Sequence, residues 1–168
     1  KWAESIDGYI APKSKRDKRP HWISNELSRQ ISHKWRSQEH AIMIGHNTVK
    51  HDTPILNTRN WNNINNRKFI IGNEQIGLNG FEKIETKGKT LKALDICQYL
   101  HHKKIQSVII EGGRFTLNKF LEEDVWDEVR VFVGGAKIID GIQAPKLKSK
   151  YYRKTKVGKD RLYFFKNY

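Results

Sequence analysis

The sequence has little cysteine, little proline and no long hydrophobic run. Cys97 is the only cysteine among 168 residues, which excludes an internal disulfide and a zinc site built on cysteine pairs. No apolar run approaches the roughly 18 residues of a membrane-spanning helix, and the first residues lack the apolar core of a secretory signal. We therefore expect a cytoplasmic protein without membrane contact. Because the chain opens without Met, we also expect it to be a piece of a longer one.

Acidic residues are scarce relative to basic ones. The 18 acids stand against 32 lysines and arginines, a formal net charge of +14, which favours an anionic partner such as nucleic acid or a small phosphorylated molecule. Much of the excess lies in Lys13 to Lys18, Lys146 to Lys150 and Arg153 to Lys159. Charge runs are usually solvated surface, so we do not expect nucleic acid to be the main partner.

The histidines do not form a recognisable metal motif. His40, His46 and His51 are close in sequence, but they straddle an expected strand and loop, no H-E-x-x-H pattern is present, and no cysteine pair assists them. We predict no metal site. With 37% hydrophobic and 11% aromatic residues, the chain can build one core, and we expect a single domain over residues 1–168.

The hydrophobic pattern alternates between strands and helices. Ser24 is a candidate N-cap for a helix with Leu27, Ile31 and Trp35 on its apolar face, and Thr90 for a second with Leu91, Leu94, Cys97 and Leu100. The strands that we expect are 41–45, 67–71, 105–111, 129–133, and a hairpin of 151–157 with 162–165. We expect the segment from 46 to 66 to be a loop with a turn at Asp52. This order predicts an α/β layer with a mixed sheet.

The stretch from Ser107 to Arg114 combines a buried strand, a carboxylate and a glycine pair. After Val108-Ile109-Ile110 come Glu111, Gly112 and Gly113, and then a helical pattern with Phe115, Leu117, Phe120 and Leu121. Glycines at a helix start let a phosphate approach unpaired N–H groups. Taken alone, a glycine pair after a strand is more often a turn, and Glu111 more often an ion-pair partner.

Several short motifs recur together in an order that resembles one family. They are Lys1-x-Ala3-x-Ser5-x-Asp7-Gly8, Trp22-Ile23-Ser24, Arg36, Ala41-Ile42-Met43-Ile44-Gly45-x-x-Thr48-Val49, Asp52-x-Pro54, Leu56-x-x-Arg59, Glu111-Gly112-Gly113 and Asp127-Glu128. Together they resemble the reductase domain of the bacterial bifunctional riboflavin-biosynthesis deaminase/reductase. The resemblance implies a dihydrofolate-reductase-like α/β fold with a central, mixed and mostly parallel sheet flanked by helices.

The resemblance also implies an activity and a set of site residues. It implies NADPH-dependent reduction of the ribosyl group of 5-amino-6-(5-phosphoribosylamino)uracil, in a homodimer with a fused or adjacent zinc deaminase domain. Lys1 and Glu111 would be catalytic, Arg36, Leu56, Arg59 and Glu111 would bind the substrate, and the cofactor would contact Ala3, Trp22, Thr48, Asp52, Gly112, Gly113, Arg114 and Phe115.

The chain departs from the family pattern at two places. Pro20 precedes His21-Trp22 where many relatives have a small polar residue. In place of the usual Pro-x-Arg-x-Val-x-Asp strand, the chain has only Asn65-Asn66-Arg67-Lys68-Phe69-Ile70-Ile71, so either that strand is absent or residues are missing between Arg59 and Arg67. Two alternatives therefore stay open. The domain could be a non-catalytic binder of nucleotide or nucleic acid on the same fold, or a reductase of a related pterin or uracil substrate.

Overall fold

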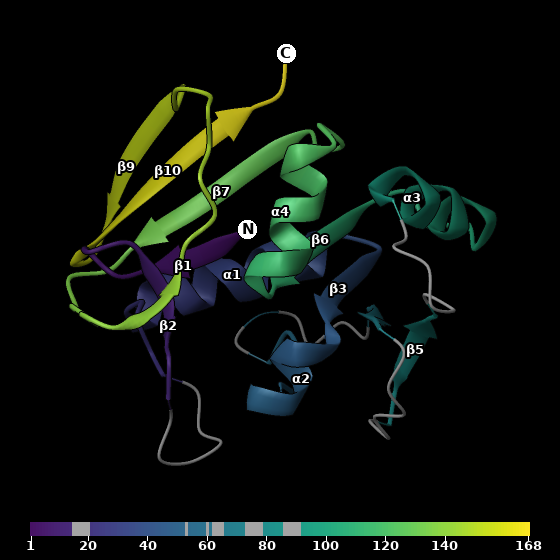
Figure 1. Cartoon of the computed structure of the whole chain (residues 1–168), viewed down its shortest axis with the longest axis horizontal. Helices are drawn as coiled ribbons and strands as arrows, with labels where there is room; N and C mark the ends of the chain where they lie inside the picture. Colours follow the sequence, from purple (N-terminus) through teal and green to yellow (C-terminus); the bar gives the residue numbers. More distant parts are fainter. Residues whose placement is uncertain (15–20, 53, 60, 62–65, 73–78, 86–91) are drawn as a thin grey trace.

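The computed structural model describes residues 1–14, 21–52, 54–59, 61, 66–72, 79–85 and 92–168 (Figure 1). The elements in chain order are β1 (Trp2–Glu4), β2 (Tyr9–Pro12), α1 (Glu26–Gln38), β3 (Ala41–Gly45), α2 (His46–Asp52), β4 (Arg67–Ile71), β5 (Phe81–Ile84), α3 (Ala93–His102), β6 (Val108–Gly112), α4 (Arg114–Glu122), β7 (Glu128–Val133), β8 (Gly141–Gln143), β9 (Arg153–Val157) and β10 (Asp160–Lys166). Among the described residues, no helix is long and apolar enough for a membrane crossing.

The strands form two four-stranded sheets and a short ribbon. The first sheet is parallel throughout, in the order β5-β4-β3-β6. The second has the order β1-β7-β10-β9, with β1 and β7 parallel and β10 antiparallel to both of its neighbours. The main-chain nitrogen of Lys1 donates to the carbonyl oxygen of Ile110 at 2.9 Å, which joins β6 to the start of β1. The expected mixed and mostly parallel arrangement is confirmed.

Helices cover both faces of this sheet. All five residues of β3 are buried, as expected for a strand in a parallel sheet whose two faces are both covered by other elements. Because side chains alternate along a strand, Ile42 and Ile44 share one core with Trp35 of α1, whereas Ala41 and Met43 belong to the core beneath α3 and α4. In Figure 1, α1 passes behind the sheet while α4 lies in front of it. The two cores hold the carboxyl end of β3 rigidly in place.

Several sequence predictions of local structure need correction. The N-cap of α1 is Asn25, whose side chain accepts from the Ser28 N–H, and not Ser24; Leu27 is exposed. Helix α3 starts at Ala93 and buries Ala93, Ile96 and Leu100. Leu100 is therefore buried as predicted and Cys97 packs against the same core, but Leu94 is exposed; Thr90 and Leu91 lie outside the described residues. A strict three-residue spacing drifts around a helix of 3.6 residues per turn, which explains the error.

Some short elements were not predicted, and the strands that were predicted are confirmed. Helix α2 occupies a segment expected to be loop, and the short strands β5 and β8 were missed. The predicted strand at Arg67–Ile71 is β4, which pairs with β3 in the parallel sheet. The predicted terminal hairpin is β9 and β10.

The stretch from β6 into α4 has the expected strand, turn and helix. Gly113 is the residue before α4 and has φ 75°, in the region that favours glycine. Leu117 and Phe120 are buried as predicted, but Phe115 is 73% exposed, so it does not belong to the core face of α4. The turn therefore needs Gly113 for its backbone conformation, whatever ligand it meets.

The close approach of Gly134 to Ile23 allows a test of the packing beside the site. A Cβ at Gly134 would lie 2.0 Å from the Ile23 carbonyl oxygen, whereas one at Gly135 would meet nothing within 4 Å. We expect Gly134→Ala to lower the free energy of unfolding by about 1–3 kcal/mol, because main chain must shift. Urea unfolding would measure this, with Gly135→Ala as the matched control. Equal stability of the two variants would contradict the prediction.

Candidate active site

A cavity of about 400 Å³ opens beside β3 and β6. From β3 the chain proceeds outward to β4 and β5, and then returns to the other side of β3 as β6, so the strand order reverses between β3 and β6. Ligands of open α/β sheets bind at such a switch point, beyond the carboxyl ends of the strands. The cavity lining includes Ile44 from the end of β3 and Glu111 from the end of β6. It also includes Lys1, whose main chain joins the two sheets at the seam between β6 and the start of β1.

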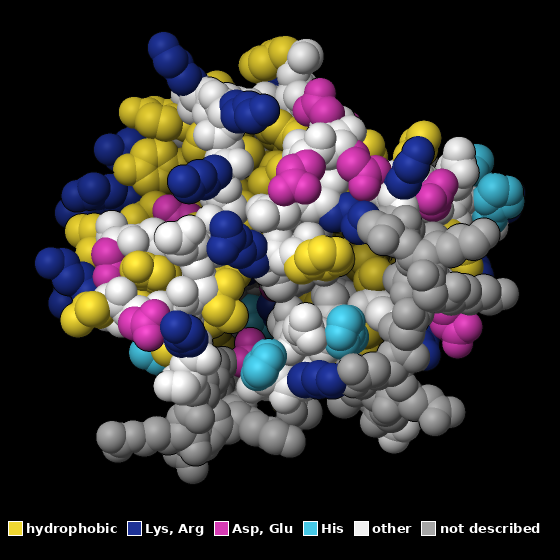
Figure 2. Space-filling model, in the orientation of Figure 1, with side chains coloured by type: hydrophobic (Ala, Val, Ile, Leu, Met, Phe, Trp, Pro, Cys, Tyr) yellow, Lys and Arg dark blue, Asp and Glu magenta, His cyan; other side chains and the backbone are white. Residues whose placement is uncertain are grey.

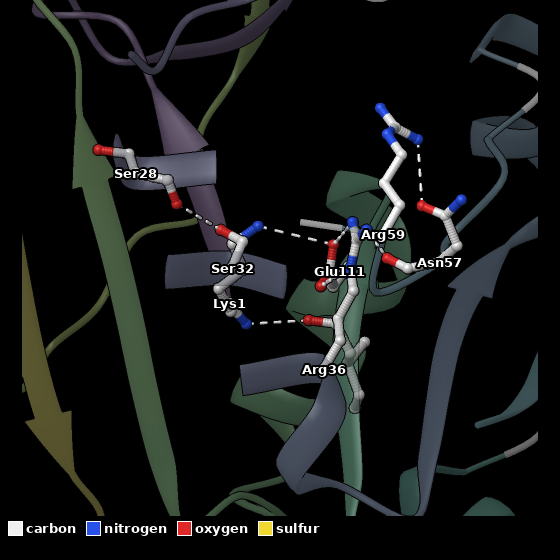
Figure 3. A network of polar contacts seen from close by, with 8 residues as sticks. Lys1, Ser28, Ser32, Arg36, Asn57, Arg59 and Glu111 are labelled. Atoms are coloured by element: carbon white, nitrogen blue, oxygen red, sulfur yellow. Dashed lines mark hydrogen bonds and ion pairs between the residues drawn. The ribbon is translucent and has the colours of Figure 1, made fainter. Parts of the chain in front are cut away.

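Glu111 is the centre of a buried cluster of charges (Figure 3). Arg36 donates to it twice, from Nε to Oε1 at 2.8 Å and from Nη2 to Oε2 at 2.7 Å, and Lys1 Nζ lies 3.6 Å from Oε2. The Glu111 side chain is only 6% exposed, and those of Lys1 and Arg36 are nearly as well buried. Such paired geometry fixes the position of all three groups.

The cluster shifts the pKa of each member. Burial alone raises the pKa of Glu111, but the positive charges of Arg36 and Lys1 outweigh burial and hold that pKa well below its usual value. Burial, with Arg36 nearby, lowers the pKa of the Lys1 side chain, and Glu111 only partly opposes this. Glu111 is therefore an anion at neutral pH, while Lys1 loses its proton more readily than an ordinary lysine.

Helix α1 presents four polar residues to the cavity at helical spacing. Arg29, Ser32, His33 and Arg36 follow the i, i+3, i+4, i+7 pattern of one helix face, and all four line the cavity. The start of α1 is held by the β9–β10 hairpin, since Asp160 accepts from the Asn25 N–H and the Ser28 hydroxyl, both at 2.7 Å. The hairpin thus sets the position of this polar face.

The loop after α2 forms the opposite wall. Arg36 also donates from Nη1 to the carbonyl oxygen of Asn57 at 3.0 Å, while the exposed Arg59 donates from Nη1 to Asn57 Oδ1 at 3.1 Å. Leu56 is buried, with φ 47°. Figure 3 shows Arg59 beyond Arg36, on the side of the cluster away from Lys1. The predicted substrate residues Arg36, Leu56, Arg59 and Glu111 thus line one cavity.

The predicted cofactor residues divide into two groups. Ala3, Trp22, Thr48 and Asp52 line the cavity, whereas Gly112, Gly113, Arg114 and Phe115 do not. The glycines nevertheless lie against it, because a Cβ at Gly112 or Gly113 would be 3.0 or 3.1 Å from the Thr48 hydroxyl oxygen. Phe115 is exposed, with Lys119 Nζ 5.9 Å from its ring centre. Gly112 and Gly113 thus pack against Thr48, a residue of the cavity wall.

Sequence reasoning missed three residues of the α1 face, namely Arg29, Ser32 and His33. Their spacing from Arg36 was the available signal, because polar residues that recur at helical spacing on a helix with a buried Trp35 define a second functional face. His21 and Ser24 also line the cavity. Among the described residues, no three histidines, cysteines or acids come close enough together to hold a metal ion.

Comparisons with known proteins give a consistent result. A family model described as the RibD C-terminal domain matches residues 1–160. The chain is 28% identical to riboflavin biosynthesis protein RibD of Aquifex aeolicus, over 100% of this chain and 57% of that protein, and 28% identical to RibD of Corynebacterium ammoniagenes, over 84% and 44%. It therefore spans about half the length of these relatives.

Solved structures support the same fold. The deaminase and 5-amino-6-(5-phosphoribosylamino)uracil reductase of Thermotoga maritima superposes with a TM-score of 0.81 at 20% identity, over 99% of this chain and 55% of that one. Dihydrofolate reductase of Enterococcus faecalis, complexed with NADP(H), superposes with a TM-score of 0.63 at 12% identity, over 99% and 94%. The dihydrofolate-reductase-like architecture expected from the sequence is confirmed.

Proposed function

The chain belongs to the RibD C-terminal domain family, and from this membership together with the site we propose that it is a pyrimidine reductase of riboflavin biosynthesis. The observation that carries the proposal is the buried cluster of Lys1, Arg36 and Glu111 in the wall of the cavity beside β3 and β6. An acid and a lysine with shifted pKa values in a cavity are the features of a catalytic site. A binding domain without catalysis would have no need of so many buried charges.

The substrate that we propose is 5-amino-6-(5-phosphoribosylamino)uracil, which the name of the Thermotoga relative specifies. The charges in the cavity suit a phosphorylated molecule, since Lys1, Arg29, Arg36 and Arg59 outnumber Asp52 and Glu111. Arg36 still has N–H donors beyond its three hydrogen bonds, and exposed Arg59 is within reach of solutes. We propose that these two guanidinium groups hold the substrate phosphate, beside Leu56.

The cofactor that we propose is NADPH. Two observations fit a dinucleotide: the cavity has Trp22, Thr48 and Asp52 in its wall, and Gly112 and Gly113 approach Thr48 too closely to carry side chains, so no side chain there keeps a phosphate from the main chain. The glycines, with Arg114 and Phe115 after them, would take the cofactor phosphates at the start of α4, where main-chain N–H groups are unpaired. When bound, the cofactor supplies a hydride.

Lys1 and Glu111 would act on the sugar. Reduction adds a hydride to the ribosyl carbon as the ring opens, and the ring oxygen needs a proton to become a hydroxyl. The Lys1 ammonium can polarise that oxygen or stabilise its developing negative charge, and Glu111 can accept hydrogen bonds from the substrate. Arg36 holds Glu111 in place, so the cluster orients the reacting carbon.

The wider biological setting is part of the proposal. We expect the reductase to work as a homodimer in the cytoplasm. We also propose that it is associated with a zinc deaminase, because the name of the Thermotoga protein combines a deaminase activity with a reductase activity. Purified protein should oxidise NADPH when 5-amino-6-(5-phosphoribosylamino)uracil is added, as followed by absorbance at the wavelength of the reduced nicotinamide. A protein that neither binds nor oxidises NADPH with this substrate would disprove the proposed function.

The role of Arg59 can be tested separately. We expect Arg59→Ala to raise the Michaelis constant for the phosphorylated substrate about 10- to 100-fold with little change in turnover, since hydrogen bonds to a charged group are lost. Arg161 is an exposed arginine of β10 and does not line the cavity. Arg161→Ala removes the same charge there and is the matched control. Unchanged binding of the phosphorylated substrate by Arg59→Ala would show that the assignment is wrong.

One observation favours a second candidate function, nucleic-acid binding without catalysis. Figure 2 shows basic side chains gathered over the β9–β10 side of the molecule, among hydrophobic side chains. Arg153 and Lys154 lie 3.9 and 5.3 Å from the ring centres of Phe164 and Tyr163. Salt-dependent retention on RNA by a protein without affinity for NADPH would favour this alternative. The remaining alternative, a reductase of a related pterin or uracil substrate, would be identified if such a compound competed with 5-amino-6-(5-phosphoribosylamino)uracil for the site.

A further inference from the structure

His33 is a buried polar residue that the fold does not use. It lies on α1, three residues before Arg36, and lines the cavity although only 6% of it is exposed. Its Nδ1 atom is sealed from solvent and has no hydrogen-bond partner among the described residues. Buried polar groups that serve the fold are nearly always hydrogen-bonded. The ring makes no such bond from Nδ1, which a ligand cannot reach, so a contact with a ligand would have to come from the other ring nitrogen.

The second ring nitrogen is the one that a ligand can reach. Within the described part of the chain, Nε2 of His33 has no hydrogen bond either, but it is not among the atoms that are sealed from solvent. Because Nδ1 is sealed, Nε2 is the ring nitrogen left for a ligand in the cavity that His33 lines. With the proton on Nε2, the neutral ring offers a single N–H donor to the cavity.

The charges around His33 determine its protonation state. Burial, followed by Arg36 on the same helix and Arg59 on the facing loop, lowers the pKa of His33 to about 4; Lys1 adds to this and Glu111 of β6 opposes it. The imidazole is therefore neutral at neutral pH. Between two guanidinium groups, a neutral donor contributes a directed hydrogen bond without adding a third positive charge to repel them.

We propose that His33 is a third ligand of the substrate phosphate, donating a hydrogen bond from Nε2 beside Arg36 and Arg59. The inference rests on the proposed function, because it identifies the bound anion as the phosphate of a phosphoribosyl group. A phosphate oxygen accepts such a bond more strongly than a neutral group does. The pyrophosphate of the cofactor would instead lie at Gly112 and Gly113, which approach Thr48.

Calorimetric titration of ribose 5-phosphate and, separately, of NADPH would test the assignment. The glutamine amide nitrogen can occupy the position of Nε2, whereas that of asparagine is too short. We expect His33→Leu and His33→Asn to weaken ribose 5-phosphate binding about tenfold or more, and His33→Gln to recover most of the affinity. NADPH affinity should be unchanged in all three variants, and His102→Leu, an exposed histidine of α3, should change neither affinity.

Each other outcome would overturn the inference in a distinct way. If His33→Gln binds ribose 5-phosphate as weakly as His33→Asn, the ring only fills space. A loss confined to NADPH would place His33 on the cofactor side. Undiminished binding of ribose 5-phosphate by His33→Leu would exclude any contact. If the wild type oxidises NADPH with the full substrate while His33 proves irrelevant, only this inference fails, whereas a wild type that binds neither ligand would remove the proposed function as well.

Discussion

Glu111→Ala is expected to abolish most turnover and to lower the free energy of unfolding by about 3–5 kcal/mol, because it leaves two buried cations without their counterion. The Glu111 side chain is 6% exposed and accepts two hydrogen bonds from Arg36, with Lys1 3.6 Å away. Activity would be measured at saturating substrate and stability by urea unfolding. A fully active and equally stable Glu111→Ala variant would contradict both the catalytic role and the importance of the cluster.

A surface ion pair of the same geometry is the matched control. Arg67 donates from Nε and Nη2 to the two carboxylate oxygens of Glu82, each at 2.7 Å, but both side chains are 39% exposed. Solvent screens this pair, so Glu82→Ala should lose only a small fraction of the stability that Glu111→Ala loses. The comparison separates the effect of burial from that of hydrogen-bond geometry.

The pH dependence of stability should identify Glu111 as an ionised group. Its pKa is lower in the folded protein than the ordinary value of 4.5, because Arg36 and Lys1 outweigh the effect of burial. The stability that the carboxylate contributes is therefore fully present above pH 4.5 and is lost as the pH falls below it. We expect the stability difference between wild type and Glu111→Gln to narrow in acid, which unfolding curves at several pH values would measure.

Lys1→Met is expected to reduce turnover about 10²- to 10⁴-fold, the range typical for loss of a group that transfers or stabilises a proton. NADPH affinity and the Michaelis constant should change little, because the phosphate contacts are made by other residues. The main-chain bond from Lys1 to Ile110 does not involve the side chain, so the seam between the sheets stays intact. Unaltered turnover would remove Lys1 from the mechanism.

The pH profile gives Lys1 a second, independent readout. If the protonated amine is the active form, turnover should fall as the pH rises through the pKa of Lys1, which burial and Arg36 place below the ordinary 10.5. Lys1→Arg keeps its positive charge over this range and should lack that alkaline decline. An identical alkaline decline in wild type and Lys1→Arg would show that another group is responsible.

Strong local patterns made much of the fold predictable. The β-branched run at β6, the apolar run at β3 and the β9–β10 hairpin are confirmed. They could be predicted because an apolar or alternating pattern indicates which residues of a strand are buried. Helix α2 and strands β5 and β8 were missed. Helix α2 buries only Val49 and β8 is Gly-Ile-Gln, so the local pattern is weak and these elements depend on neighbouring strands and helices more than on local preference.

The sequence by itself determined the candidate residues, since Lys1, Arg36, Arg59 and Glu111 came from their order in motifs that resemble one family. Only the tertiary structure decided how they act on one another. Glu111 and Arg36 are 75 residues apart in the chain yet form the central ion pair, and Asp160 holds the start of the helix that carries Arg36. Ion pairs and cavities depend on distances between segments, which spacing along the chain does not contain. For that reason the sequence does not indicate that His33 Nδ1 lacks a hydrogen-bond partner, or that α1, β6 and the loop at Arg59 surround one cavity.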